Sequence, residues 1–232
     1  ARTVAIDPAG WPRDRPPRLR GAPRARSRAA GLARRRDIRF EDVRGQGAVA
    51  RLIKRMLLRI EETMVEPDAG IWEYRGAARV HTFSLLFHWT GASIAKRIAE
   101  RLNDPELAEL ATRLMRASRE IIERDCYSEE LGYYVDSTTT KNPDAALLMM
   151  LNLGYLDPSS DRAKRHVYGL ARELGQPGGL VQRYRHEDDF GASSSTFTVC
   201  GFWYAEALAR LGQREEARKV CEKLVNYANS HG

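Results

Sequence analysis

The sequence predicts an all-α protein, a helical toroid or solenoid whose apolar inner helices are screened by amphipathic outer ones. Three observations support this fold class. From about Gly47 onward, segments with apolar residues at helical spacing are separated by short loops of Gly, Pro, Asn and Asp. Strongly apolar segments alternate with amphipathic ones. The last two helices are joined only by Gly212 and Gln213, which makes them antiparallel neighbours.

The first three helices are predicted from apolar spacing and from end signals. Residues 48–64 form the first helix, which stops before Pro67 because helical backbone is disfavoured ahead of a proline. Residues 82–102 are apolar on most sides, as expected of an inner helix. The third helix starts at Asp104, an N-cap residue followed by proline, and runs to about residue 124 with a more charged outer face.

The second half of the chain repeats this order. An apolar helix is expected at 143–153 and an amphipathic one at 161–174. The last pair is expected at 198–211 and 214–230, which brings the total to about seven helices. A short strand-like piece at 132–135 lies in one of the polar loops between the pairs.

The positive charge of the chain belongs to one tail. The net charge is +7, but residues 1–36 hold 11 Arg and two Asp, whereas the other 196 residues hold 27 basic and 29 acidic side chains. The tail has five prolines and no periodic apolar pattern, so we expect it to be disordered or an artefact of a wrong reading frame or start. A nucleic-acid-binding function would rest on this tail alone, and no nucleic acid partner is expected for the remaining chain.

The composition excludes several other classes. Apolar clusters such as 145–151 are far shorter than the roughly 18 residues of a membrane-spanning helix, so no membrane partner is expected. The three cysteines are too few for a disulfide framework and are interpreted as reduced thiols of a cytoplasmic protein. His81 and His88 lack a third ligand, so no metal site and no cofactor are expected.

Two loops carry candidate functional residues. In the first, Glu73 lies between Trp72 and Tyr74, whose rings could raise the pKa of a general acid and stack on a sugar. The second combines Arg183 with acidic residues at 187–189, a mixture that can hold a polyhydroxyl ligand by paired hydrogen bonds. A surface glutamate beside a half-buried tryptophan and a solvated charged loop remain the alternatives.

Eight segments, in order, resemble the carboxyl-terminal catalytic domain of glycoside hydrolase family 15, which contains the glucoamylases and the related bacterial trehalases. They are PDAGIWE (67–73), RVHTFS (79–84), NPDAALL (142–148), LGYL (153–156), RY (183–184), DDFGA (188–192), VCGFWY (199–204) and REEAR (214–218). The resemblance implies a partial (α/α)6 barrel over residues 37–232. It also implies inverting hydrolysis of an α-glucoside, such as trehalose or a short α-glucan.

The resemblance also assigns roles to individual residues. It implies that Glu73 is the general acid and that Trp72 borders the first sugar subsite. The substrate-binding residues that it implies are Arg79, His81, Arg183, Asp188 and Asp189. The sequence departs from the family pattern at Leu85 and at residues 193–195, which puts substrate affinity in question.

The second carboxylate of an inverting mechanism is not identified in the chain. In the family it lies near a GNFPQ segment, expected beyond Gly232, and about seven of twelve barrel helices are visible. We therefore expect the chain to be a fragment that is inactive alone and that exposes apolar surface of its inner helices. The competing hypothesis is a non-catalytic helical-repeat module that binds a protein partner, which places Glu73 and Trp72 on different sides from Arg183.

Overall fold

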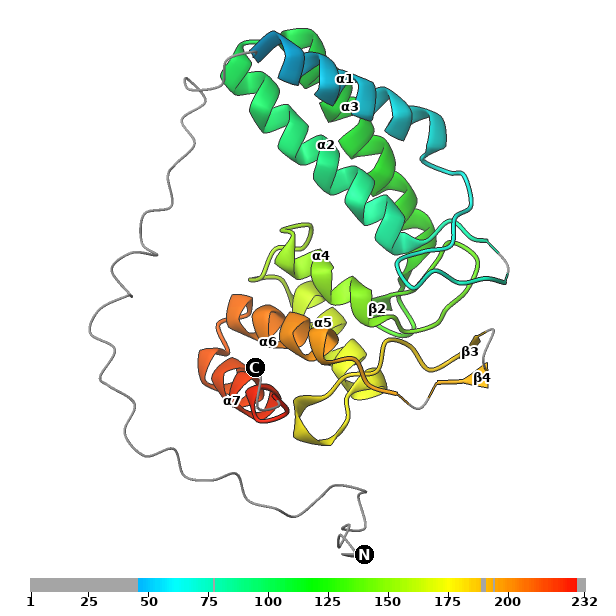
Figure 1. The fold of residues 1–232 in the computed structure, drawn as a ribbon, viewed down its shortest axis with the longest axis vertical. Helices are drawn as coiled ribbons and strands as arrows, with labels where there is room; N and C mark the ends of the chain where they lie inside the picture. Colours follow the sequence, from blue (N-terminus) through cyan, green and yellow to red (C-terminus); the bar gives the residue numbers. More distant parts are fainter. Residues whose placement is uncertain (1–45, 77, 189–190, 194, 229–232) are drawn as a thin grey trace, which may run out of the picture. The chain divides into compact units, whose positions relative to one another are not determined.

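The computed structural model describes residues 46–76, 78–188, 191–193 and 195–228 (Figure 1). They belong to one compact unit, Gly45–Gly232. The predicted tail, residues 1–36, lies outside the described residues, as do residues 37–45 at the start of the predicted catalytic domain. The described part contains seven α-helices joined by loops, short turns and two-residue strands, which confirms the all-α prediction.

The first helices form a tight hairpin with a third helix against it. α2 (Thr82–Leu102) and α3 (Pro105–Ile121) pack along their length, and α1 (Gln46–Thr63) lies against both (Figure 1). Asn103 ends α2 in the left-handed region, with φ 53°. Asp104 then begins α3 by accepting a hydrogen bond from the N–H of Leu107 at 3.0 Å. The predicted N-cap is confirmed, and the two-residue connection makes α2 and α3 antiparallel neighbours.

The remaining helices follow the predicted order. The 3-10 turn η3 (Ala145–Leu148) leads into α4 (Met149–Asn152), and this segment packs against α5 (Asp161–Leu174) and α6 (Thr198–Arg210). α6 and α7 (Arg214–Val225) form the last pair.

The segment expected at 143–153 differs from a regular helix. It starts at Ala145 as a 3-10 turn because Asp144 has extended backbone, with φ −137°, and its side chain caps the N–H of Ala146 at 2.8 Å. The backbone of Asp144 pairs instead with Tyr184, in the loop before α6. A long-range contact thus shortens the helix that the local pattern predicts.

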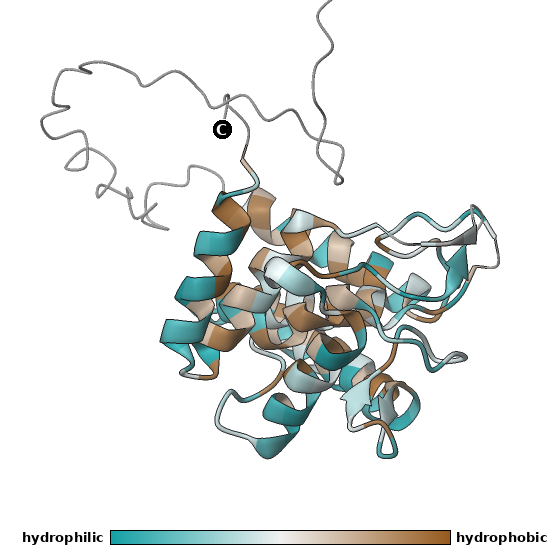
Figure 2. Ribbon diagram, turned by 90° about the horizontal axis from the view of Figure 1, so that it is seen from below, coloured by the Kyte–Doolittle hydropathy of each residue, from teal (hydrophilic) through white to brown (hydrophobic). Residues whose placement is uncertain are grey.

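The core follows the alternation of apolar and amphipathic helices. Fully buried leucines come from α2 (Leu85, Leu86) and from η3 and α4 (Leu147, Leu148, Leu151). One core cluster joins these helices with α3 and α5, and a smaller cluster lies between α6 and α7. Hydrophobic residues gather toward the interior of the described helices, and hydrophilic residues mark their outer turns (Figure 2).

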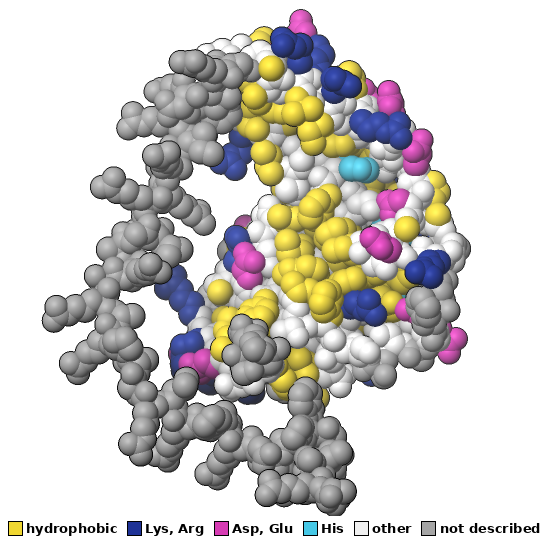
Figure 3. Space-filling model, in the orientation of Figure 1, with side chains coloured by type: hydrophobic (Ala, Val, Ile, Leu, Met, Phe, Trp, Pro, Cys, Tyr) yellow, Lys and Arg dark blue, Asp and Glu magenta, His cyan; other side chains and the backbone are white. Residues whose placement is uncertain are grey.

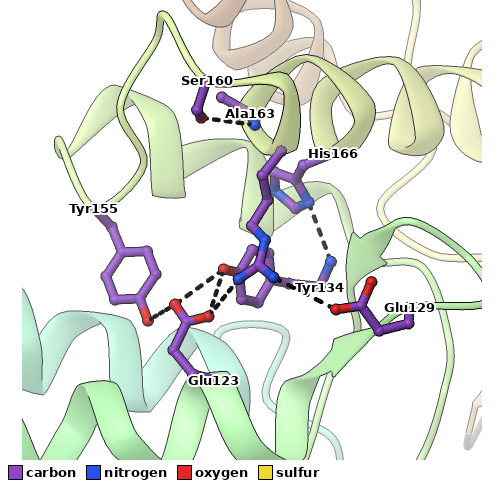
Figure 4. Close-up of polar contacts among 8 residues, drawn as sticks. Glu123, Glu129, Tyr134, Tyr155, Ser160, Ala163 and His166 are labelled. Atoms are coloured by element: carbon purple, nitrogen blue, oxygen red, sulfur yellow. Dashed lines mark hydrogen bonds and ion pairs between the residues drawn. The ribbon is translucent and has the colours of Figure 1, made fainter.

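A polar network holds the end of α3 to the following segments. The helix passes into a π-helical turn, η2 (Ile122–Cys126), instead of continuing as an α-helix to residue 124. From this turn Glu123 accepts hydrogen bonds from the hydroxyls of Tyr134 and Tyr155, at 3.0 and 2.7 Å, and pairs with Arg162 at 2.7 Å (Figure 4). The network fixes the hairpin after α3 and the start of α5.

The loops that precede the inner helices meet at one end of the described helices. β1 (Tyr127–Ser128) pairs with β2 (Tyr133–Tyr134), and β2 lies within the strand-like piece predicted at 132–135. β3 (Glu187–Asp188) pairs with β4 (Gly191–Ala192). Isolated antiparallel bridges connect the loops further: Asp68 with Arg79, His81 with Ser137, and Asp144 with Tyr184. These bridges place residues far apart in sequence at one end of α2, η3 and α6.

Some apolar side chains of the helices remain exposed. They include Leu52 and Met56 on α1, Phe87 and Ile94 on α2, and Phe202 on α6. A space-filling view shows hydrophobic side chains gathered on the face seen in Figure 1 (Figure 3). None of the helices in the described part combines the length and apolarity needed to cross a membrane.

Candidate active site

The loop before α2 is closed by its own backbone. Asp68 and Arg79 exchange two backbone hydrogen bonds, at 2.8 and 3.1 Å, across the base of the loop. Within it, the N–H of Tyr74 donates to the carbonyl of Ala69 at 2.9 Å. Gly70 has φ +65°, and a Cβ there would lie 3.0–3.1 Å from the ring of His81. The loop therefore requires glycine at this position for two reasons, its backbone conformation and its contact with His81.

Glu73 occupies a strained place in this loop. Its side chain is exposed, and its φ is +54°. Among the described residues, Asn103 is the other non-glycine with positive φ, and it ends a helix, where Asn is common. Asparagine tolerates left-handed backbone because its short side chain can form local hydrogen bonds, whereas glutamate does not have this compensation. Backbone strain of this kind is concentrated at functional sites. Glu73 is also the residue that the family resemblance implies as the general acid.

Trp72 joins the acid loop to two other loops. Its indole Nε1–H donates to Oδ1 of Asp144 at 3.0 Å. Its ring lies 6.3 Å from Tyr184 and 6.2 Å from Trp203, measured between ring centroids. The guanidinium carbon of Arg183 is 5.7 Å from the Trp72 ring centroid. Residues from the loops before α2, η3 and α6 therefore meet around one indole.

This contact contradicts an expectation of the competing hypothesis. A helical-repeat binding module was expected to place Trp72 and Arg183 on different sides of the molecule. The structure brings the Arg183 guanidinium over the ring of Trp72. Trp72 directly precedes Glu73 in the chain. The sequence-predicted Trp72, Glu73 and Arg183 thus share one end of the described helices.

His81 belongs to an aromatic stack beside this cluster. It is buried at the start of α2, and its ring lies parallel to Tyr74, with centroids 5.7 Å apart. Tyr74 also lies 5.2 Å from Tyr184, which stacks on His186 at 4.6 Å. The Nε2 atom of His81 has no hydrogen-bond partner among the described residues. This nitrogen is therefore an enclosed polar atom that has no partner among the described side chains.

The charged candidates lie around His186. Burial lowers the pKa of this histidine, and the nearby Arg79 lowers it further, while the carboxylates of Asp136 and Asp188 oppose the shift. Asp188 also accepts a hydrogen bond from the hydroxyl of Tyr184. Arg79 and Asp188 are thus close to the aromatic stack.

Asp189 completes the predicted set of substrate-binding residues, but it lies outside the described residues.

Asp144 is a central residue that sequence reasoning left without a role. It is buried, with 3% of its surface exposed, and burial raises its pKa to about 7, with the Asp136 carboxylate adding to the shift. Hydrogen bonds from the Ala146 N–H and from Trp72 oppose the shift. In the sequence, Asp144 follows Asn-Pro and precedes an apolar run, a pattern that predicts a helix cap. This pattern does not predict the hydrogen bond from Trp72.

A hollow lies on the α2 side of the acid loop. It has a volume of about 430 Å³ and is bounded by loop residues 68–71 and by Phe83, Ser84, Phe87 and His88 of α2. The described residues contain no cluster of three or more His, Cys, Asp or Glu side chains able to hold a metal ion.

Comparison with known proteins gives consistent matches along the chain. The family model described as glycosyl hydrolases family 15 matches residues 41–231. A trehalase of Mycobacterium tuberculosis is 34% identical over 170 residues, which make up 71% of this chain and 24% of that protein. A trehalase of Thermoplasma volcanium is 25% identical over 181 residues, 78% of this chain and 29% of that protein. The chain therefore spans less than a third of the length of these relatives.

A solved structure described as a wild-type glycosidase matches the fold. Its TM-score is 0.64 at 16% sequence identity, and the match covers 77% of this chain and 45% of that chain. The likeness confirms the predicted fold, a partial (α/α)6 helical toroid. Because the family model matches most of this chain, residues 41–231, the chain belongs to glycosyl hydrolases family 15.

Proposed function

We propose that this chain supplies the proton-donating side of a site that hydrolyses α-glucosidic bonds, in trehalose or a short α-glucan, with inversion. Family membership and the trehalase relatives support the reaction class. The observation that carries the assignment is the setting of Glu73, an exposed carboxylate in left-handed backbone next to Trp72. Arg183, whose guanidinium lies over the same indole, is our candidate for contacts with the hydroxyls of a bound sugar.

Glu73 acts as a general acid in this mechanism. Its carboxyl proton passes to the glycosidic oxygen while the bond between that oxygen and the anomeric carbon breaks. Water attacks the anomeric carbon from the opposite face and gives its proton to a second carboxylate, so trehalose yields two glucose molecules. Trp72 borders the sugar whose bond is cleaved, and Arg79, His81 and Asp188 are candidates for its hydroxyl contacts.

The second carboxylate is proposed to come from a different segment. An inverting site needs it roughly 6.5–9.5 Å from the acid, with room for a water molecule. The family resemblance associates it with a GNFPQ segment, a string that does not occur in these 232 residues. The 232-residue chain alone is therefore expected to release no glucose from trehalose. Turnover by this chain that Glu73→Gln abolishes would contradict that expectation.

The proton-donor role is tested in the full gene product. Glu73→Gln keeps the size of the side chain and removes the proton, so kcat for trehalose should fall by about 10²–10⁴-fold. Glu66→Gln is the matched control, because Glu66 is also an exposed glutamate near the same loop. It should keep the wild-type kcat. Equal kcat values for the two variants would refute the assignment.

Substrate and stereochemistry are tested in the same protein. Initial rates with trehalose, maltose and isomaltose identify the preferred linkage. NMR spectra recorded during the first turnovers of maltose should show β-glucose released from the non-reducing ring, as inversion requires. Initial release of α-glucose from that ring would contradict the inverting mechanism.

A further inference from the structure

Asp144 connects three segments of the candidate site. Its Oδ1 accepts hydrogen bonds from Trp72 Nε1–H, at 3.0 Å, and from the N–H of Ala146, at 2.8 Å. Its backbone forms a bridge with Tyr184, and the next N–H along the chain donates to the carbonyl of Arg183 at 2.9 Å. The buried side chain is therefore tied to the acid loop and to the start of η3, and the backbone at the same residue is tied to the loop before α6.

We propose that Asp144 is a positioning residue for the hydrolysis assigned above: through the indole of Trp72 it sets the place of Glu73 relative to Arg183. This inference rests on the proposed function. Asp144 is buried and does not need to touch the substrate, so its effect would be transmitted through its hydrogen bond to Trp72.

The ring contacts of Trp72 leave its orientation incompletely fixed. Tyr184, Phe197 and Trp203 lie 6.2–6.3 Å from the Trp72 ring, at interplanar angles from 40° to 66°. Such contacts tolerate sliding and rotation in the plane of the ring. The hydrogen bond from Nε1 is directional and removes this freedom. Without Asp144, the half-buried indole N–H would also lose its present acceptor.

Fixing the indole also constrains the acid. Trp72 precedes Glu73 directly, and the loop places Glu73 in left-handed backbone, where its N–H donates to the carbonyl of Gly70 at 3.2 Å. Because the two residues share a peptide group, a displacement of the indole that reaches the backbone of Trp72 would also move Glu73. Because a misplacement of about 1 Å can lower a rate by about 10²-fold, the tie from Asp144 should affect kcat more than substrate binding.

The chain offers a matched control for this role. Asp104 and Asp144 both cap a helix by accepting a backbone N–H, at 3.0 Å from Leu107 and 2.8 Å from Ala146. Asp144 has the additional bond to Trp72, whereas Asp104 lies at the far end of α2, between α2 and α3. Loss of a cap is therefore common to both alanine variants, and loss of the indole tie is specific to Asp144→Ala.

Steady-state kinetics of the full gene product with trehalose test the inference. Asp144→Ala should lower kcat by about 10–100-fold with KM changed less than about threefold. Asp144→Asn, which keeps the acceptor Oδ1, should retain most of the wild-type kcat, and Asp104→Ala should retain all of it. Adding Asp144→Ala to Trp72→Phe, which lacks the N–H, should cause little further loss. A full multiplicative loss in the double variant would overturn the inference.

A second measurement does not depend on activity. In protein labelled with ¹⁵N-tryptophan, the indole N–H signal that Trp72→Phe removes should be protected from solvent exchange in the wild type. Exchange as fast as that of a free indole would overturn the inference. If the signal is protected but the protein hydrolyses no α-glucoside, the hydrogen bond between Trp72 and Asp144 is supported and the proposed function is rejected. Activity with unchanged kcat in Asp144→Ala would reject the positioning role alone.

Discussion

Replacing Glu73 with glycine should make the protein more stable while it removes the proposed proton donor. Glu73 has φ +54°, a conformation that costs an L-residue about 1–2 kcal/mol and costs glycine nothing sterically. Glycine loses about 0.5–1 kcal/mol more backbone entropy on folding. The side chain is exposed, so its loss changes stability little. The expected net gain for Glu73→Gly is about 0.5–1 kcal/mol.

Two further glycine variants calibrate this value. Asn103 is also left-handed, with φ 53°, but asparagine tolerates this region, so Asn103→Gly should gain less than Glu73→Gly. Glu109 is exposed inside α3, where glycine costs about 1 kcal/mol relative to a good helix former. Glu109→Gly should therefore be less stable than the wild type.

Urea unfolding at 25 °C and thermal unfolding, both followed by circular dichroism, measure the series. For a protein of this size, about 1 kcal/mol corresponds to a Tm shift of about 2–4 °C. The expected order of stability is Glu73→Gly, then Asn103→Gly, then wild type, then Glu109→Gly. If Glu73→Gly lost as much stability as Glu109→Gly, the inference of backbone strain at Glu73 would be refuted.

Two other expectations concern stability alone. Gly201→Ala should destabilise by about 1–3 kcal/mol, because its Cβ would lie 2.8 Å from the carbonyl oxygen of Gly179 and 2.8 Å from the side chain of Leu224. Gly91→Ala, with 3.7 Å to its nearest neighbour, should instead gain about 1 kcal/mol in urea unfolding. Equal effects would disprove the close packing of α6 against α7. Burial lowers the pKa of His166 to about 4, so its contribution to stability is lost as the pH falls from about 6.5 toward 4, by up to about 3 kcal/mol. The raised pKa of Asp144 acts in the opposite direction over this range, so the test is the difference between wild type and His166→Gln, which should grow as the pH rises from 4 to 7.

The helices could be predicted from the sequence because their signals are local. The amphipathic helix expected at 161–174 has the bounds of α5, and the apolar helix expected at 82–102 has the bounds of α2. Asp104 was predicted as an N-cap from its place before a proline, and its side chain does accept the N–H of Leu107. Apolar periodicity and caps involve residues only a few positions apart, so one sequence is enough to detect them.

The start of η3 could not be predicted in this way. The apolar run at 143–153 has the composition of a helix, but the backbone of Asp144 pairs with Tyr184, forty positions later. The end of α3 shows a similar effect, because Glu123 in its π-helical turn contacts Tyr155 and Arg162. In both places a contact between distant segments determines the local backbone. Local propensity depends only on neighbouring residues, so it does not predict such a contact.

The sequence supplies the candidate residues of the site but not the contacts between them. The family motifs identified Trp72, Glu73 and Arg183, and the structure brings Trp72 and Arg183 together. The left-handed backbone of Glu73 was not foreseen, because glutamate disfavours it and the nearby Gly70 was the visible turn signal. The bond from Trp72 to Asp144 spans 72 positions between two irregular loops, where spacing gives no information.

The central claim is that Glu73 donates a proton to the leaving sugar, and a comparison of leaving groups tests it most directly. Trehalose needs protonation of its glycosidic oxygen, whereas fluoride leaves α-glucosyl fluoride without a proton donor. In the full gene product, Glu73→Gln should lower kcat/KM by about 10²–10⁴-fold for trehalose and by less than about tenfold for α-glucosyl fluoride. Equal losses with both substrates would contradict the claim.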